Sequence, residues 1–356
     1  MNIALVAETA PAKTLIPIIS KLDADILSLT HSEGAMKLLS PYSNEIESIG
    51  EGRRNNSKKR SNLTIARLVL QDTHRTYKAL KDRYIDLLLT CGNAGDVRKG
   101  ILAAKRLDIP RLHMEQDVYN PIEMIAYADL ITVPNQHAKK KLKKMYDITN
   151  TVNIKGYPQA EYVSKQKLIN PNKLYEHYGT DDFYILFLGG DTNPEDIPEI
   201  INQVQKLDKD IIIVPYRFEI DFIRQYITRP RVFIVKGHVD LVSLMNASQG
   251  IIYCAGMGVT IESGALSVPA VKIQGFHTKH ASNDLARTLG INVVSVYDIP
   301  YAVDHMRAPY GKLLIKNGCK ASMRAAELTS QMNLFDQTQG GRNSLKKIWN
   351  QRKKYR

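Results

Sequence analysis

The segment from Gly250 to Ile273 combines an apolar strand, a glycine turn and a carboxylate at a spacing that suits nucleotide binding. The apolar run Ile251 to Cys254 predicts a buried parallel strand, and Gly256 and Gly258 predict a tight turn into a helix. Free amides at such a helix N-terminus form an anion site that often holds a phosphate. Glu262, expected in the first helical turn, can accept two hydrogen bonds from ribose hydroxyls. The segment therefore predicts a nucleotide site, although an α/β protein can contain such a turn without any ligand.

A second group of polar residues follows the strands expected in the first half of the chain. Glu115 and Asp117 follow the predicted strand Arg111 to Met114, and Glu8 follows the predicted strand Asn2 to Ala7. Ligands of parallel sheets bind at the carboxyl ends of the strands. These three carboxylates are therefore the candidate general bases of an enzyme.

Strands and helices alternate along the whole chain, which predicts doubly wound parallel sheets. The segment Gly156 to Asn172 has the prolines and polar residues of a linker. We therefore expect an N-terminal Rossmann-like domain over residues 1–158, a second one over 159–335, and a basic tail or helix over 336–356.

The composition is that of an ordinary globular protein. Of the 356 residues, 44% are hydrophobic and 24% are charged, and the length favours two domains. No secretory leader and no membrane-spanning apolar run is visible, and the spacing of the three cysteines fits neither a disulfide framework nor a metal site. The sequence thus predicts a cytoplasmic protein without a metal.

The net charge of +13 is concentrated in three clusters. Residues 51–60 carry five basic side chains, residues 139–144 carry five lysines, and the last 15 residues carry seven basic groups and no acid. Such clusters either face solvent or bind an anionic membrane surface reversibly. No aromatic-interleaved RNA-binding signature accompanies them, so no nucleic acid partner is expected.

Two such domains, with a nucleotide-type turn in the second, resemble the GT-B fold. The stretch GHVDLVSLMNASQGIIYCAGMGVTIESGALSVPAVKI is similar to the donor half of glycosyltransferase family 28, the MurG-type transferases. The family's spacing of glycine, glutamate and proline matches Gly256, Glu262 and Pro269, and its later asparagine matches Asn283. IPRLHMEQD, ending at Asp117, is similar to the family's first-domain motif.

This resemblance implies a peripheral enzyme at the inner face of the cell membrane. It would transfer N-acetylhexosamine from a UDP-sugar to a lipid-linked cell-envelope precursor, with the UDP-sugar as substrate and no cofactor. The implied acceptor-side residues are Thr14, Gly92, Asn93 and Gly95. The implied donor-side residues are Gly189, Gly190, Thr192, His238, Val239, Gly256, Met257, Gly258, Thr260, Glu262, Lys279, His280 and Asn283.

The sequence departs from the family at several positions with chemical consequences. Thr14 stands where the family has a histidine, which removes the obvious general base. Asp191 stands where a neutral phosphate donor is expected, and Lys279 and His280 stand where two glutamines would bind the sugar. We expect an inverting, metal-independent transfer in which Glu115 is the first choice of base. Asp117 and Glu8 compete with it, and the alternative role of Glu115 is to hold a loop amide.

Two other function classes stay open. The non-hydrolysing UDP-N-acetylglucosamine 2-epimerases share the fold and resemble this chain at HMEQ, but the family's GHRREN turn is replaced here by GGDTNPED. A non-catalytic sugar-nucleotide or lipid-surface binding protein is the third class, because the histidine is lost. Free UDP only with an acceptor, an epimeric sugar, or binding without turnover would distinguish the three.

Overall fold

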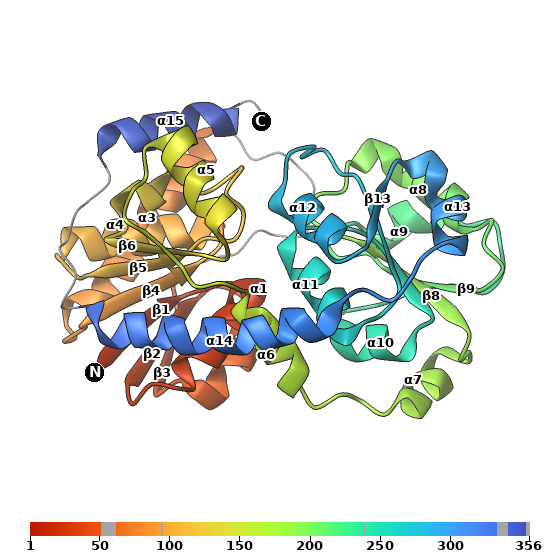
Figure 1. The fold of residues 1–356 in the computed structure, drawn as a ribbon, viewed down its shortest axis with the longest axis horizontal. Helices are drawn as coiled ribbons and strands as arrows, with labels where there is room; N and C mark the ends of the chain where they lie inside the picture. The colour runs from red at the N-terminus through yellow and green to blue at the C-terminus, as the bar shows by residue number, and fades with distance from the viewer. Residues whose placement is uncertain (51–61, 94, 238, 333–340, 354–356) are drawn as a thin grey trace. The chain divides into compact units, whose positions relative to one another are not determined.

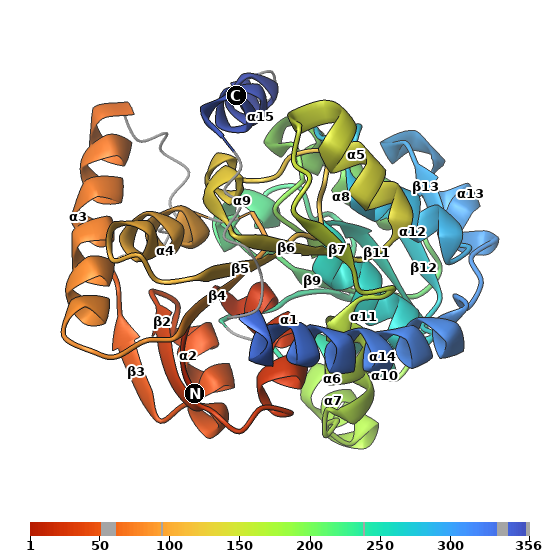
Figure 2. The ribbon, with the colours of Figure 1, turned by 60° about the vertical axis from the view of Figure 1, so that its left-hand side comes forward.

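A computed structural model of the chain describes residues 1–50, 62–93, 95–237, 239–332 and 341–353. The described chain forms two compact units (Figures 1 and 2). Unit 1 contains the described residues of 1–54, 59–162 and 316–356, and unit 2 contains those of 163–315.

Unit 1 is built on a seven-stranded parallel sheet with the order β3-β2-β1-β4-β5-β6-β7. Leu5 pairs with Ser28 on one side and with Leu89 on the other, so β1 is an interior strand between β2 and β4. The strands are β1 (Asn2–Val6), β2 (Asp25–Thr30), β3 (Glu45–Ser48), β4 (Leu87–Cys91), β5 (Arg111–Met114), β6 (Leu130–Val133) and β7 (Thr151–Asn153).

Helices cover both faces of this sheet, which explains why its central strands are apolar on both sides. One face packs on residues of α3 (Asn62–Lys81), α4 (Gly95–Arg106), η2 (Glu123–Tyr127), α5 (Gln136–Tyr146) and α15 (Arg342–Lys353). The other packs on residues of α1 (Thr9–Ile19), α2 (Glu33–Leu39) and α14 (Gly311–Ser330). The short helix η1 (Ser40–Tyr42) follows α2.

Unit 2 contains a six-stranded parallel sheet with the order β10-β9-β8-β11-β12-β13. Its strands are β8 (Phe183–Leu188), β9 (Asp210–Val214), β10 (Val232–Ile234), β11 (Gly250–Cys254), β12 (Ala270–Ile273) and β13 (Asn292–Val294). Its helices are α7 (Pro171–Tyr178), η3 (Pro194–Asp196), α8 (Ile197–Val204), α9 (Ile220–Arg224), α10 (Leu241–Ala247), α11 (Met257–Leu266), α12 (Ala281–Thr288), η4 (Val296–Asp298) and α13 (Ile299–Asp304).

The division into units differs from the expected domain limits at both ends. The expected linker contains α6 (Pro158–Lys165), and the units divide within this helix, after Tyr162. The chain returns to unit 1 at Lys316, since Ala321 and Ala325 of α14 and Ile348 of α15 are buried in the two cores of unit 1. The C-terminal segment is thus an integral helix of unit 1 (Figure 1).

A short turn follows the first strand. Helix α1 begins at Thr9, close behind the end of β1 at Val6. Pro11 is compatible with helix because it lies in the first turn, where its missing N–H leaves no hydrogen bond broken. Among the described residues, no helix has the length and apolarity that crossing a membrane requires.

Candidate functional site

Two glycine turns lie side by side at the carboxyl edge of the unit 2 sheet. The first follows β8 and the second follows β11. The amide of Gly189, after β8, donates to the carbonyl of Cys254 at the end of β11, at 2.9 Å. A Cβ on Gly189 would lie 2.5 Å from that carbonyl oxygen, so no other residue fits this close approach. Thr192 also donates its hydroxyl to the Cys254 carbonyl, at 3.2 Å. Thr192 therefore fastens the two turns to each other, and Gly190 lies in a more open place.

The turn between β11 and α11 exposes backbone as the sequence predicts. Gly256 and Gly258 are half-buried, whereas the neighbouring Met257 is buried. Thr260 is fully buried, and its hydroxyl has partners inside the protein. It donates to the Gly256 carbonyl at 3.1 Å and accepts from the Tyr253 hydroxyl at 3.0 Å. Thr260 thus supports the turn, and the accessible groups there belong to the glycine backbone.

Glu262 occupies the second turn of α11, since the helix begins at Met257; the expectation of a first-turn position is wrong. Its side chain is buried. A carboxylate in this place is held by the helix close to the sheet, so a ribose that reached it would meet a fixed acceptor.

The helix α12 contributes a third side of this edge. His280 is its N-cap, and its Nδ1 accepts from the Ser282 amide at 3.1 Å. The ring also lies against the second turn, because a Cβ on Gly256 would be 3.4 Å from His280 Cε1. Asn283 is buried and donates to the Thr278 carbonyl at 3.1 Å, and Lys279 is exposed. Val239 is half-buried, and His238 lies outside the described residues.

Two further residues of this edge, Tyr216 and Arg217, were not among the predicted site residues. Tyr216 follows β9 and has a φ of 53°, a conformation that is uncommon for a non-glycine residue. Arg217 donates to the Tyr216 hydroxyl at 2.9 Å, and the Tyr216 ring lies 3.8 Å from the place of a Cβ on Gly190. The rule that ligands bind beyond strand ends was a signal for both.

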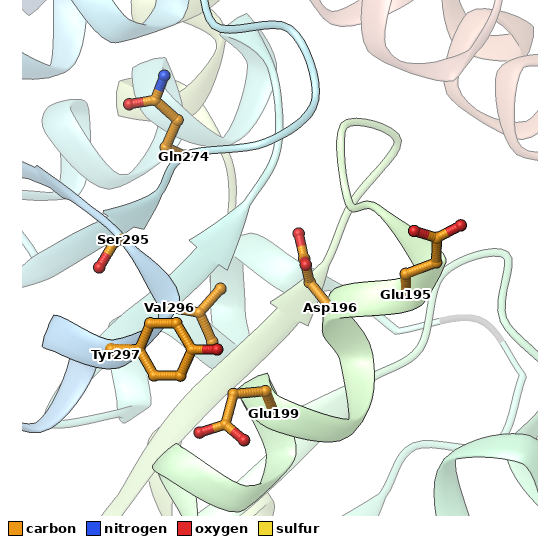
Figure 3. A pocket seen from close by; sticks show the side chains of 7 residues that line it. All are labelled: Glu195, Asp196, Glu199, Gln274, Ser295, Val296 and Tyr297. Carbon is orange, nitrogen blue, oxygen red and sulfur yellow. The ribbon is translucent and has the colours of Figure 1, made fainter.

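A cavity of about 390 Å³ lies among residues that follow β8, β12 and β13 (Figure 3). Figure 3 shows Asp196 and Glu199 opposite Val296 and Tyr297. Its other lining residues are Glu195, Gln274 and Ser295. Three carboxylates disfavour a diphosphate by like-charge repulsion, so a nucleotide phosphate fits the glycine turns and not this cavity.

In unit 1, the side chains of Glu8 and His31 contact each other at the carboxyl edge of the sheet. His31 Nε2 lies 3.1 Å from Glu8 Oε1, and the Glu8 side chain is 27% exposed. Asp96, in the first turn of α4, is fully buried. Burial, followed by the charge of Glu8, raises the pKa of Asp96 to about 7. Glu8 is thus a solvent-accessible carboxylate with two titratable neighbours.

The other two base candidates are less accessible. Glu115 is fully buried at its side chain, and its Oε1 accepts from the Asp117 amide at 2.8 Å. His113 Nε2 lies 3.4 Å from Glu115 Oε2, and its Nδ1 lies 2.9 Å from the Thr90 hydroxyl. Asp117 is buried as well. Glu115 therefore holds a loop amide, which was the alternative role considered for it.

The four expected acceptor-side residues do not form one exposed surface. Thr14 is buried within α1 and accepts from Gln116 at 2.9 Å. Asn93 donates to the Asn120 carbonyl at 3.2 Å. Gly92 has a φ of +78° in the turn after β4, and Gly95 begins α4 with open space around its Cα. Gly92 and Asn93 shape the turn after β4, whereas Thr14 bonds to the segment that follows β5.

Two of the three basic clusters meet in unit 1. Helix α15 contacts α5, and Lys347 pairs with Asp147. The α5 lysines 140, 143 and 144 are exposed, and Trp349 is 36% exposed. Ile348 is fully buried in the core of unit 1 and therefore does not belong to this exposed surface. The cluster at 51–60 lies outside the described residues.

Solved structures share this fold at low sequence identity. A UDP-GlcNAc 2-epimerase from Methanocaldococcus jannaschii, in complex with UDP-GlcNAc and UDP, is 17% identical with a TM-score of 0.70, over 93% of this chain and 100% of that one. The UDP-N-acetylglucosamine 2-epimerase of Rickettsia bellii is 15% identical with a TM-score of 0.69, over 95% and 98%. The calicheamicin glycosyltransferase CalG4 is 12% identical with a TM-score of 0.54, over 93% and 98%.

No protein-family model matches the chain, and no curated protein sequence matches it. The two parallel sheets with their covering helices, together with these structural neighbours, confirm the expected fold class: the chain has the GT-B fold of two Rossmann-like domains.

Proposed function

We propose that the protein is an enzyme acting on a UDP-N-acetylhexosamine, whose nucleotide binds at the carboxyl edge of the unit 2 sheet. The observation that carries the proposal is the contact between the two glycine turns. The Gly189 amide donates a hydrogen bond to the Cys254 carbonyl, next to the half-buried Gly256. Backbone amides at this end of α11 suit a diphosphate, and the buried Glu262 suits the ribose. The full-length likeness to an epimerase with bound UDP supports this assignment.

The reaction we propose first is epimerisation at C2 of the sugar. Removal of the proton from C2 balances if the C–H electron pair forms a C1–C2 double bond while the C1–O bond to UDP breaks. Return of a proton to the other face of C2 as UDP adds back to C1 completes the inversion, so acid–base groups are needed. Glu8, with His31 at 3.1 Å and the nearby Asp96, supplies titratable groups of this kind in unit 1. We propose Glu8 as the proton-transferring residue because it is the most exposed of the three base candidates. The higher TM-scores with epimerases than with the glycosyltransferase also support epimerisation.

Glycosyl transfer to a lipid-linked acceptor at the inner membrane face is the second candidate. The adjacent α5 and α15, with exposed lysines and Trp349, are suited to reversible docking on an anionic membrane. A transferase would need a single general base, for which Glu8 is again the accessible choice. The third class, binding without catalysis, shares the same UDP site.

Incubation of the protein with UDP-N-acetylglucosamine in D₂O, followed by NMR of the sugar, tests the proposal. An epimerase forms the C2 epimer and incorporates deuterium at C2. Release of UDP only when a lipid-linked acceptor is added would identify a transferase. Binding without either product would show the non-catalytic class, and the absence of UDP-sugar binding would contradict all three.

A further inference from the structure

Asp191 and His277 form a carboxylate–imidazole pair next to the glycine turns of unit 2. His277 Nδ1 lies 2.7 Å from Asp191 Oδ1, and the His277 amide donates to the same oxygen at 3.2 Å. The side chains are 5% exposed for Asp191 and 16% exposed for His277. The pair is therefore largely enclosed, with the imidazole as its more accessible part.

The backbone of the two loops fixes the pair in place. The Phe276 amide donates to the Asp191 carbonyl at 3.2 Å. A Cβ on Gly275 would lie 2.2 Å from the same carbonyl oxygen, so the loop after β12 packs directly on the turn after β8. This contact requires glycine at position 275. It places His277 beside Asp191, which directly follows Gly190 in the sequence. The pair is thus built before any ligand arrives.

The pair also connects the first glycine turn to the second. His277 is bonded to Asp191 of the first turn, and the His280 ring lies against Gly256 of the second. The centroids of the two imidazole rings are 6.2 Å apart. Asp191 and His280 lie close to His277, and the ammonium of the buried Lys272 interacts favourably with Asp191. Two partly exposed imidazoles thus lie beside the glycine turns at which the proposed nucleotide would place its phosphates.

The chemistry of the pair explains why an acid stands at position 191, where a neutral phosphate donor was expected. A carboxylate on Nδ1 fixes the orientation of the imidazole ring and leaves Nε2 on the side that faces away from the carboxylate. An imidazolium donates from both nitrogens, and its hydrogen bonds to phosphate are charge-assisted. Asp191 would repel a phosphate if exposed, but its Oδ1 is committed to His277 and the residue is buried.

We propose that His277 binds the diphosphate of the UDP-sugar and that Asp191 is its positioning residue. This inference rests on the proposed function and adds to it the group that distinguishes a nucleoside diphosphate from a nucleoside. His277 replaces, from the loop after β12, a phosphate contact that the turn after β8 would otherwise provide.

Calorimetric titration of the full chain with UDP, UMP and uridine tests this proposal. His277→Ala should weaken UDP binding about tenfold or more, which corresponds to the loss of one charge-assisted hydrogen bond, and leave uridine binding unchanged. His277→Gln, which keeps a donor, should recover part of the loss. His305→Ala, in an exposed histidine at the end of α13, is the matched control and should bind like the wild type.

Asp191→Asn separates positioning from a purely structural role. A positioning role predicts weaker UDP binding with unchanged uridine binding, whereas a structural role alone would weaken both ligands in parallel. Unchanged UDP affinity in a folded His277→Ala protein would overturn the proposal while leaving the nucleotide site intact. A wild-type protein that binds neither UDP nor uridine would overturn the proposed function, and this inference with it.

Discussion

The ammonium of Lys272 donates a hydrogen bond to the carbonyl oxygen of Ala255 at 2.7 Å, although the lysine is fully buried in β12. Burial lowers the pKa of Lys272, and the charge of Asp191 opposes that shift. Ala255 directly precedes Gly256, so this bond holds the turn on which the proposed phosphate site depends.

Lys272→Met is expected to lower the free energy of unfolding by about 1–3 kcal/mol, because the Ala255 carbonyl loses its partner inside the protein. UDP affinity should fall as well, since the turn would be less well fixed. Urea unfolding and calorimetry measure the two effects. The exposed Lys312 provides the control Lys312→Met, which should change neither. Equal stability of both variants would show that the Lys272 bond contributes nothing to the turn.

Asp96 gives a prediction about pH. Its folded-state pKa is raised from 3.8 to about 7, so between these values the folded chain binds a proton that the unfolded chain has released. Stability is therefore greatest below the unfolded pKa and falls as pH rises towards 7. Asp96→Asn should raise the unfolding temperature at pH 8 and have little effect at pH 4. Each unit by which the pKa of Asp96 is raised in the folded state corresponds to about 1.4 kcal/mol of unfolding free energy that the substitution restores at pH 8. The exposed Asp82→Asn should show no such pH dependence; a pH-independent difference for Asp96→Asn would refute the assignment.

The catalytic role of Glu8 can be tested against the two buried candidates. Glu8→Gln should lower turnover by about 10² to 10⁴ and leave UDP affinity nearly unchanged, because it removes proton transfer and not nucleotide binding. Glu115→Gln should mainly destabilise the loop that contains Asp117, because Glu115 accepts a hydrogen bond from the Asp117 amide. Asp117→Asn completes the set. If Glu8→Gln keeps full turnover while Glu115→Gln loses it without loss of stability, the order of the candidates is wrong.

Membrane docking is expected through the exposed lysines of α5 and through Trp349 of α15. Cosedimentation with anionic vesicles should decrease with salt and should decrease further in the double variant Lys143→Glu, Lys144→Glu. Lys206→Glu with Lys312→Glu is the charge-matched control from unit 2. Equal binding to neutral and anionic vesicles would argue against this role of the cluster.

The alternation of strands and helices was enough to predict both sheets, because buried parallel strands are short apolar runs that the sequence shows directly. β11 and the Gly256 turn agree with the prediction closely. The return of the C-terminal segment to unit 1 was not predictable from local pattern. It depends on Ala321, Ala325 and Ile348 being buried in cores that the first half of the chain forms, and small or isolated apolar residues carry little local signal.

The candidate site was predicted at the level of position and not of pairing. The rule that ligands bind at the carboxyl ends of parallel strands located Glu8, Glu115 and the glycine turns. The sequence pattern does not show which of these side chains are hydrogen-bonded to neighbouring residues. Thr260 and Glu115 are examples. The Thr260 hydroxyl donates to the Gly256 carbonyl, and the Glu115 carboxylate accepts from the Asp117 amide. The Asp191–His277 pair joins residues 86 positions apart, and only the packing of Gly275 on the β8 turn brings them together.

Calorimetry of UDP binding to Glu262→Ala tests the central claim, that the edge of unit 2 formed by β8, β11 and α11 is a UDP site. We expect the wild type to bind UDP and the variant to bind it more weakly by about 1.5–3 kcal/mol, through loss of charge-assisted hydrogen bonds to the ribose. Glu176→Ala, in an exposed glutamate of α7 on the amino-terminal side of β8, should bind like the wild type. An unchanged UDP affinity in a folded Glu262→Ala protein would contradict the claim.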